Sequence, residues 1–347
     1  MSATVLPAHA DVGGPAQPLL SVRGLVKHFP LKQAPWQRRG GTAVRAVDGV
    51  DFEVLKGETL GVVGESGCGK STTARLVMQL LAQDRGELVF DGLTVGSHRL
   101  SLREFRRQAQ MVFQDSYSSL NPRMTIEDSV AFAPTVHGVP RAQAVTAARE
   151  LLERVGLQPQ RFAGRYPHEL SGGQRQRVNI ARALALRPRL VILDEAVSAL
   201  DKSVEAQVLN LLLDLKAAFG LTYLFISHDL NVVQYISDRV MVMYLGEVVE
   251  LGPVQAVFHR PMHPYTQALL RSMPSMDPAQ RTEAAPLAGD PPNPIDPPPG
   301  CRFHTRCAHA RAICRQQAPE LRRHGPHAVR CLIHQPESGY AASEALT

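Results

Sequence analysis

The eight residues Gly64–Ser71 read GESGCGKS and decide the fold class of this chain. They fit the pattern G-x-x-x-x-G-K-[ST] at every fixed position, between a β-branched run at Thr59–Val63 and an amphipathic stretch at Ser71–Leu81. Glycines at these positions let backbone N–H groups surround phosphate oxygens at the positive end of a helix. The pattern therefore predicts a phosphate-binding loop in which Lys70 reaches the β- and γ-phosphates and Ser71 coordinates Mg²⁺.

Length and composition limit the classes of protein that remain. The 347 residues are 44% hydrophobic with a net charge of +6, which permits a folded core. At roughly 150 residues per domain, we expect two domains or one domain with an appendage. The apolar stretches are of strand length, such as Val240–Leu245, and no basic segment followed by an apolar one opens the chain. We therefore expect a cytosolic chain without a membrane-spanning helix or a secretory signal.

Short apolar runs alternate with helical patterns between Leu19 and Gly252, which predicts an α/β fold with a mostly parallel sheet. The expected buried strands are Thr59–Val63, Leu190–Leu193, Thr222–Ile226 and Val240–Tyr244. The expected helices include Ser71–Leu81, Gln143–Val155, Val204–Phe219 and Pro264–Arg271. We also expect a mobile tail at residues 1–18, an inserted loop at Ala34–Gly41, a proline-dense connector at Asp290–Gly300 and a domain boundary near residue 262.

Two acidic residues end one of the predicted strands, since Leu190–Glu195 reads LVILDE. Ligands of open α/β sheets bind at the carboxyl ends of the strands. Asp194 therefore suits the Mg²⁺ shell, and Glu195 suits a general base that activates water. Acids after a strand can also serve only as a helix cap.

The residues Leu170–Gln174 read LSGGQ and open a predicted helix. Ser171 is a good N-cap, and Gly172 and Gly173 expose N–H groups, so an anion site and a simple capped helix both fit. Between a phosphate loop and an LDE strand, LSGGQ resembles the signature of ATP-binding-cassette (ABC) ATPases. The resemblance covers about residues 19–262. It implies a P-loop NTPase fold with a mostly parallel sheet core, an antiparallel β subdomain and a helical subdomain.

The resemblance implies roles for further residues. Gln114 resembles the Q-loop glutamine that contacts Mg²⁺ or water, and His228 resembles the switch histidine near the γ-phosphate. Phe29 resembles the aromatic residue that stacks on adenine, although an apolar strand end would look the same. The implied catalytic residues are Lys70, Gln114, Glu195 and His228, and the implied Mg²⁺ ligands are Ser71, Gln114 and Asp194. The implied ATP contacts are Phe29, Gly64, Ser66, Gly67, Cys68, Gly69, Lys70, Ser71 and Thr72, with Ser171, Gly172, Gly173 and Gln174 serving the ATP of a partner subunit.

Two positions within these motifs need an interpretation of their own. Ala196 stands where the family usually has proline after the catalytic glutamate. Since both acids remain, we expect reduced local rigidity rather than lost activity. Cys68 lies at a predicted helix N-terminus beside Lys70, which predicts a lowered pKa of its thiol, unless the residue only fills a variable position.

The segment after the predicted boundary narrows the resemblance. His263–Leu270 reads HPYTQALL, and Gly289–Pro291 and Gly300–Cys307 follow it. This arrangement resembles the C-terminal region of ATP-binding subunits of bacterial oligopeptide and dipeptide importers. It implies a nucleotide-binding domain at residues 19–262 and a small cysteine-containing extension at residues 263–347.

A resemblance to importers implies an ATPase subunit that energises uptake of di- and oligopeptides, peripheral to the cytoplasmic face of the bacterial inner membrane. The implied partners are a second, related ABC ATPase in a heterodimer, two transmembrane permease subunits and a periplasmic peptide-binding protein, with no nucleic acid. Cargo such as nickel chelates, glutathione or opines is the alternative. A soluble ABC ATPase acting on nucleic acid or ribosomes fits less well, because no sustained heptads separate loop and signature and the chain holds one cassette.

Four of the five cysteines come after residue 300, at Cys301, Cys307, Cys314 and Cys331. Four thiolates suit a tetrahedral Zn²⁺ or a [4Fe–4S] cluster. The spacings are wider than those of structural zinc sites, and the resemblance also favours iron–sulfur, while zinc and free or disulfide-paired thiols remain alternatives. Seven arginines and three glutamates share this segment, so the local positive charge suits a thiolate centre rather than nucleic acid.

Overall fold

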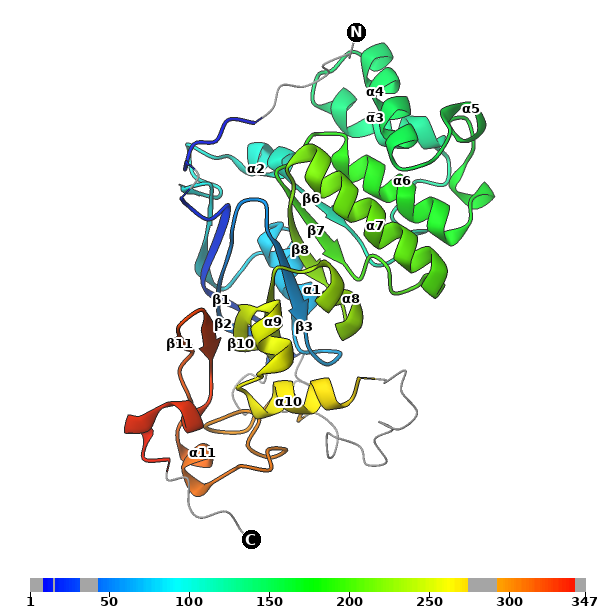
Figure 1. Cartoon of the computed structure of the whole chain (residues 1–347). Helices are drawn as coiled ribbons and strands as arrows, with labels where there is room; N and C mark the ends of the chain where they lie inside the picture. Colours follow the sequence, from blue (N-terminus) through cyan, green and yellow to red (C-terminus); the bar gives the residue numbers. More distant parts are fainter. Residues whose placement is uncertain (1–8, 15, 32–42, 274–291, 341–347) are drawn as a thin grey trace, which may run out of the picture. The chain divides into compact units, whose positions relative to one another are not determined.

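The computed structural model describes residues 9–14, 16–31, 43–273 and 292–340 (Figure 1). Residues 1–8 and 15 of the predicted tail, the predicted insertion Ala34–Gly41 and the first two residues of the predicted connector, Asp290 and Pro291, lie outside the described residues. The chain divides into two compact units that interleave along the sequence. The first unit comprises residues 1–21, 53–59 and 88–227, and the second comprises residues 22–52, 60–87 and 228–347.

The first unit contains a parallel sheet in the order β6, β7, β8 (Figure 1). All residues of β7 and β8 are buried, as expected of short apolar runs in a parallel sheet. Strand β4 pairs with β5 in an antiparallel ribbon, and helices α3, α4 and α6 pack on one another. The elements that lie within this unit are β5 (Leu93–Thr94), α2 (Leu102–Gln108), β6 (Ala109–Val112), α3 (Ile126–Val136), α4 (Arg141–Arg154), α5 (Pro159–Phe162), α6 (Gly172–Leu184), β7 (Leu190–Asp194), α7 (Lys202–Phe219) and β8 (Thr222–Ile226).

A buried carboxylate, that of Asp91, ties separate segments of the first unit together. Arg189 Nη1 donates to Asp91 Oδ2 over 2.6 Å, and Lys56 Nζ lies 2.9 Å from Oδ1. The backbone N–H of Val12 also donates to Oδ2 over 2.7 Å. Burial alone raises the pKa of Asp91, but the two cations and the backbone donor outweigh burial and hold it well below its usual range.

The second unit contains a mixed sheet in the order β11, β12, β10, β9, β3. Strand β3 is parallel to β9, and the other neighbours are antiparallel. Strands β9 and β10 form a hairpin whose turn residues Leu245 and Gly246 have φ angles of 44° and 82°, as a type I′ turn requires. The elements that lie in or enter this unit are β1 (Leu20–Pro30), β2 (Ala43–Val54), β3 (Thr59–Val63), α1 (Lys70–Val77), β4 (Arg85–Phe90), α8 (Leu230–Ile236), β9 (Arg239–Tyr244), β10 (Glu247–Pro253), α9 (Val254–His259), α10 (Pro264–Arg271), α11 (Ala312–Gln316), β11 (Arg322–His324) and β12 (His327–Val329).

The predicted α/β class is confirmed, with parallel strands at the core and antiparallel strands beside them. The four predicted strands are present with ends that differ by at most one residue, and the predicted helix Pro264–Arg271 is present as α10. The boundary near residue 262 stays a prediction, and the second unit runs through this position. Among the described helices, none is long and apolar enough to cross a membrane.

Candidate functional site

The predicted phosphate-binding loop joins β3 to α1 within the second unit. Its fixed glycines have positive φ angles, 151° at Gly64 and 106° at Gly69. A Cβ atom at Gly64 would collide with the carbonyl oxygen of Met243, and one at Gly69 with that of Ala46. Glycine is therefore required at both positions, for conformation and for space.

The side chain of Lys70 is buried against the loop. Its Nζ donates to the carbonyl oxygens of Gly64, over 2.7 Å, and Glu65, over 3.0 Å. Cys68 is also buried, with its Sγ 3.8 Å from the same Nζ. Burial raises the pKa of the Cys68 thiol, and the opposing effect of Lys70 is smaller. The expected lowered pKa is therefore wrong, because the sequence reveals the nearby lysine but not the burial.

Three residues at the loop were missed by sequence reasoning. The carboxylate of Glu65 receives two hydrogen bonds from Arg306, over 2.7 and 3.0 Å, and the backbone N–H of Glu65 donates to Tyr265 Oη over 2.9 Å. Glu65 occupies a variable position of the loop motif, and Arg306 is 241 residues away in sequence. Local sequence patterns carry no signal for such a long-range contact.

In the first unit, the predicted base and the predicted Q-loop residue are in contact. Asp194 ends β7 and is buried, and the next residue, Glu195, has a φ of 49°. The left-handed backbone is held by a 2.9 Å hydrogen bond from Glu195 N to the Ile226 carbonyl. Gln114 Nε2 donates to Glu195 Oε2 over 2.7 Å. A non-glycine residue in this conformation costs about 1–3 kcal/mol, and such strain concentrates at functional sites.

The LSGGQ segment forms a capping box at the start of α6, also in the first unit. Ser171 Oγ accepts from Gln174 N over 3.3 Å, and Gln174 Oε1 accepts from Ser171 N over 3.0 Å. A Cβ at Gly173 would collide with the Val204 side chain. The two glycines therefore open α6 without side chains over the N–H groups of its first turn. The geometry suits both readings of the motif, so its role towards a partner's ATP stays a prediction.

The remaining predicted contacts, Phe29 and His228, belong to the second unit together with the loop. Phe29 lies at the end of β1, half-buried, with Lys27 Nζ 5.7 Å from its ring centroid. His228 is exposed and follows β8. The structure thus brings Gln114 together with Glu195. It does not place the first-unit set relative to the second-unit set.

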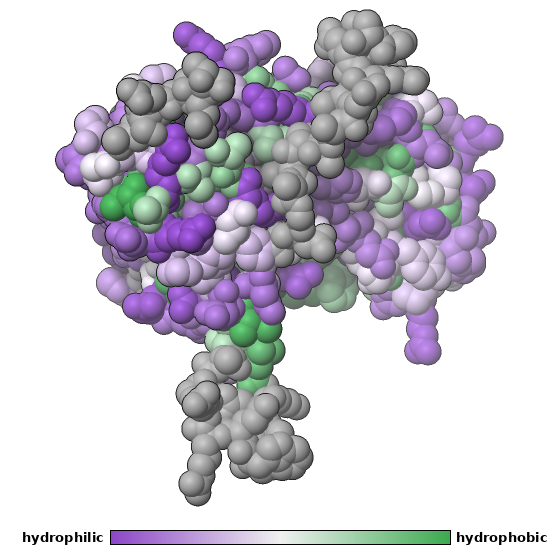
Figure 2. Space-filling model, turned by 90° about the horizontal axis from the view of Figure 1, so that it is seen from below, coloured by the Kyte–Doolittle hydropathy of each residue, from purple (hydrophilic) through white to green (hydrophobic). Residues whose placement is uncertain are grey.

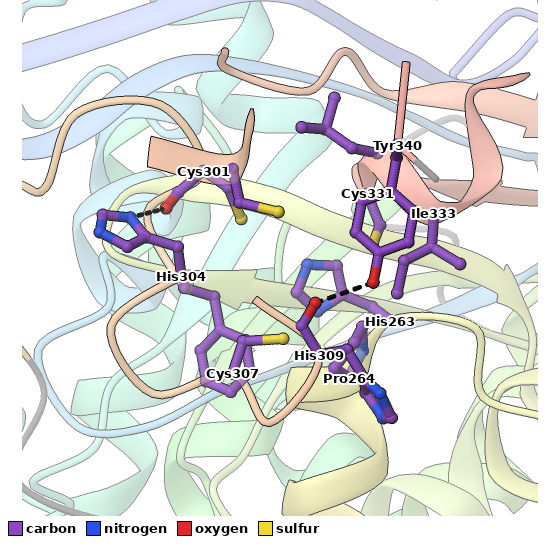
Figure 3. Close-up of a pocket in the computed structure, with 12 residues that line it drawn as sticks. His263, Pro264, Cys301, His304, Cys307, His309, Cys331, Ile333 and Tyr340 are labelled. Carbon is purple, nitrogen blue, oxygen red and sulfur yellow. Dashed lines mark hydrogen bonds between the residues drawn. The ribbon is translucent and has the colours of Figure 1, made fainter. Parts of the chain in front are cut away.

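Four predicted ligands, Cys301, Cys307, Cys314 and Cys331, line one pocket of the second unit (Figure 3). All five cysteines of the chain are free thiols. Burial is the main cause that raises the pKa of Cys301 to about 12 and that of Cys331 to about 11, and the neighbouring thiols raise both further. Burial in the pocket therefore favours the neutral thiol form of Cys301 and Cys331.

These four thiols suit a metal centre by the type of their ligand atoms, not by their arrangement. Four cysteines that line one pocket, Cys314 and Cys331 buried and Cys301 and Cys307 half-buried, are the donor set of a thiolate-ligated ion or cluster. Within residues 9–340, gaps aside, no group of three or more His, Cys, Asp or Glu side chains is arranged to hold a metal ion. The four cysteine side chains thus line the same pocket, but among the described residues they are not arranged as the ligands of a metal ion.

Comparison with protein families gives two matches. Residues 47–198 match the family described as ABC transporter, and residues 249–314 match the family described as oligopeptide/dipeptide transporter, C-terminal region. The probable peptide ABC transporter ATP-binding protein y4tS of Sinorhizobium fredii is 52% identical over 87% of this chain and 86% of its own length. The oligopeptide transport ATP-binding protein AppF of Bacillus subtilis is 49% identical over 91% of this chain and 97% of its own length.

Two solved structures share the fold. That of cbiO1 from Clostridium perfringens, part of the ABC transporter complex cbiONQ, has a TM-score of 0.60 and 27% identity, and covers 70% of this chain and 91% of its own. A dimeric, post-hydrolysis structure of the ATP-binding cassette MJ0796 with ADP and Pi has a TM-score of 0.58 and 27% identity, and covers 68% and 98%. The resemblance drawn from the motifs is confirmed over most of the chain.

Proposed function

The chain belongs to the ABC transporter family and, by its C-terminal region, to the ATP-binding subunits of peptide importers, and on this premise we propose how its residues hydrolyse ATP. It is an ATPase subunit that energises peptide import through partner membrane permeases. Because the relatives are named as peptide transport proteins, peptides are favoured as cargo over nickel chelates, glutathione or opines.

On the phosphate side, Lys70 and the loop N–H groups bind the β- and γ-phosphates. Ser71 and Asp194 hold Mg²⁺, which neutralises charge on the phosphates when it is bound. Two observations support this assignment. The glycines keep side chains away from the loop backbone, and Lys70 is anchored by loop carbonyls with its charge beside the N-terminus of α1.

The observation that carries the hydrolytic assignment is the hydrogen bond from Gln114 to Glu195. A carboxylate accepts several hydrogen bonds, so Glu195 can be oriented by Gln114 and still accept a proton from water. The left-handed backbone conformation of Glu195 fixes the direction in which its side chain leaves the main chain. In this scheme His228 orients the water or the γ-phosphate, and Phe29 stacks on adenine.

A variant of the base tests the scheme. Glu195→Gln keeps the shape and the oxygen acceptor but cannot take a proton. In the assembled transporter we expect ATP hydrolysis to fall by about 10²–10⁴-fold, the contribution of a general base, while ATP binding stays within threefold of wild type. Lys70→Ala is the control that loses ATP binding. Wild-type turnover by Glu195→Gln would contradict the assignment.

For partners, we propose a heterodimer with a second, related ATPase and peptide delivery by a periplasmic binding protein. Dimerisation is supported by the single copy of each motif, which leaves one loop and one signature per chain, and by the dimeric state of the MJ0796 cassette. Figure 2 shows a mostly hydrophilic face, which suits a peripheral subunit at the cytoplasmic side of the membrane. Co-purification of this chain as a homodimer without a second ATPase would contradict the heterodimer.

We also propose that Cys301, Cys307, Cys314 and Cys331 hold a [4Fe–4S] cluster, with Zn²⁺ as the alternative occupant. The support is the shared pocket and the thiol donor set. Such a centre would cross-link segments of the extension. Protein purified without oxygen should absorb near 400 nm and contain about four iron and four sulfide per chain. One zinc in a colourless protein identifies the alternative, and protein without metal rules out both.

A further inference from the structure

One peptide group of the phosphate loop is held at both ends. The carbonyl oxygen of Gly64 accepts from Lys70 Nζ over 2.7 Å. The N–H of Glu65, which belongs to the same planar peptide unit, donates to Tyr265 Oη over 2.9 Å. Because the peptide is planar, a rotation that breaks the Tyr265 bond also turns the carbonyl away from Lys70. Tyr265 thus acts on Lys70 through this one peptide.

The side chain of Glu65 is fixed as firmly as its backbone. Arg306 approaches the carboxylate with two parallel N–H···O bonds, which is the strong, directional form of such a pair. The Arg306 side chain is only 6% exposed, so water screens the pair weakly. The carboxylate in turn raises the pKa of Arg306, which stays charged at any physiological pH.

The groups that hold Glu65 are themselves rigid. Tyr265 is fully buried on α10, and its ring centroid lies 4.6 Å from that of Tyr244 and 5.4 Å from that of Phe303. Arg302, next to Phe303, donates to the Leu245 carbonyl and to Asp48. The segment between Cys301 and Cys307 is therefore held by two arginines: Arg302 contacts Leu245 and Asp48, and Arg306 contacts Glu65 of the loop. Helix α10 supplies Tyr265, which contacts the loop backbone.

We propose that Arg306 and Tyr265 are positioning residues for ATP, which hold the Gly64–Glu65 peptide so that Lys70 is presented to the β- and γ-phosphates. The proposal rests on the assignment of the loop to ATP binding. Neither residue touches the nucleotide in this scheme. The C-terminal extension thereby sets the affinity of the subunit for ATP rather than the chemistry of hydrolysis.

The decisive variant is Tyr265→Phe, which removes one oxygen atom and keeps the ring packing. We expect the Kd for ATP and the KM to rise about tenfold, which corresponds to about 1.4 kcal/mol, with kcat at saturating ATP within twofold of wild type. Affinity for AMP, which lacks the phosphates that Lys70 contacts, should not change. Arg306→Lys, which keeps the charge and loses the fork, should raise the Kd less than Arg306→Gln.

A matched control separates positioning from general stability. Tyr223 is also buried, and its hydroxyl donates a hydrogen bond to a backbone carbonyl, that of Leu212, over 2.9 Å. Tyr223→Phe should lower the melting temperature to a similar degree without changing the Kd for ATP. Binding is measured by equilibrium titration of the full chain with ATP and with AMP.

The outcomes distinguish a failure of the positioning role from a failure of the assignment of the loop to ATP binding. If Lys70→Ala abolishes ATP binding while Tyr265→Phe and Arg306→Gln bind like wild type, the positioning role is refuted and the loop assignment stands. If Lys70→Ala also binds ATP like wild type, the loop assignment itself fails. Equal changes in the Kd for ATP and for AMP would also overturn the proposal.

Discussion

A fully buried carboxylate, that of Glu250, provides the sharpest test of the packing in the second unit. It lies in β10 and accepts backbone N–H groups of Met262, over 2.6 Å, and His263, over 3.0 Å. His327 Nε2 lies 2.7 Å from Glu250 Oε1. Burial alone raises the pKa of Glu250, but these partners outweigh it and lower the pKa. The side chain therefore joins β10, β12 and the turn that leads into α10.

Glu250→Leu fills the same space without an acceptor, so the backbone N–H groups of Met262 and His263 lose their partner and His327 loses the carboxylate beside it. At about 1–3 kcal/mol for each buried polar group left unsatisfied, partly offset by the gain in apolar burial, we expect a loss of about 3–6 kcal/mol. Glu250→Gln keeps one oxygen and should lose about 1–3 kcal/mol. Total stabilities of about 5–15 kcal/mol make the first change close to complete unfolding.

Equilibrium urea denaturation of the full chain, followed by far-ultraviolet circular dichroism, measures these losses. Glu320→Gln is the control, because Glu320 is exposed and its ion pair with Arg322 should contribute under about 1 kcal/mol. Loss of less than 1 kcal/mol in Glu250→Leu, or an equal loss in the control, would refute the reasoning.

Three further predictions follow from single side chains. Because the pKa of Asp91 is lower in the folded chain than in the unfolded chain, its ionised carboxylate stabilises the fold at neutral pH, and this stabilisation is lost as pH falls below about 4. The urea concentration at the midpoint of unfolding should therefore fall on acidification, and it should fall less steeply in Asp91→Asn. Parallel pH dependences of the two proteins would contradict this. The buried Cys68 should react with iodoacetamide at least about tenfold more slowly than a free thiol, by mass spectrometry of the native chain, and modification at the free rate would disprove its burial. Gln114→Ala should lower kcat about 10–100-fold, with ATP affinity within threefold, and an unchanged kcat would remove Gln114 from the hydrolytic scheme.

Much of the fold is predictable because its elements are specified locally. The run Thr222–Ile226 is apolar and β-branched and becomes a fully buried strand, and Pro264–Arg271 begins with proline at a helix start and becomes α10. The pairing of β12 with β10 is different. Three residues, His327–Val329, carry no usable periodicity, and their register is set by partners far away in the sequence.

The candidate site divides in the same way. The loop, the acids after β7 and the LSGGQ segment depend on neighbouring residues, so short patterns predict them. The hydrogen bonds that hold Glu65 come from Tyr265 and Arg306, which are 200 and 241 residues away, so no local sequence pattern predicts them. The pKa of Cys68 was predicted in the wrong direction for a related reason, since the charge of Lys70 can be read from the sequence and burial cannot.

The central claim is that hydrolysis of ATP by this chain drives peptide import. Peptide uptake into proteoliposomes that contain the complete transporter, with ATP supplied on the side of this subunit, measures it directly. The wild-type complex should accumulate peptide only with ATP, and a complex with Glu195→Gln should bind ATP and accumulate no peptide. Undiminished uptake by the Glu195→Gln complex would contradict the account.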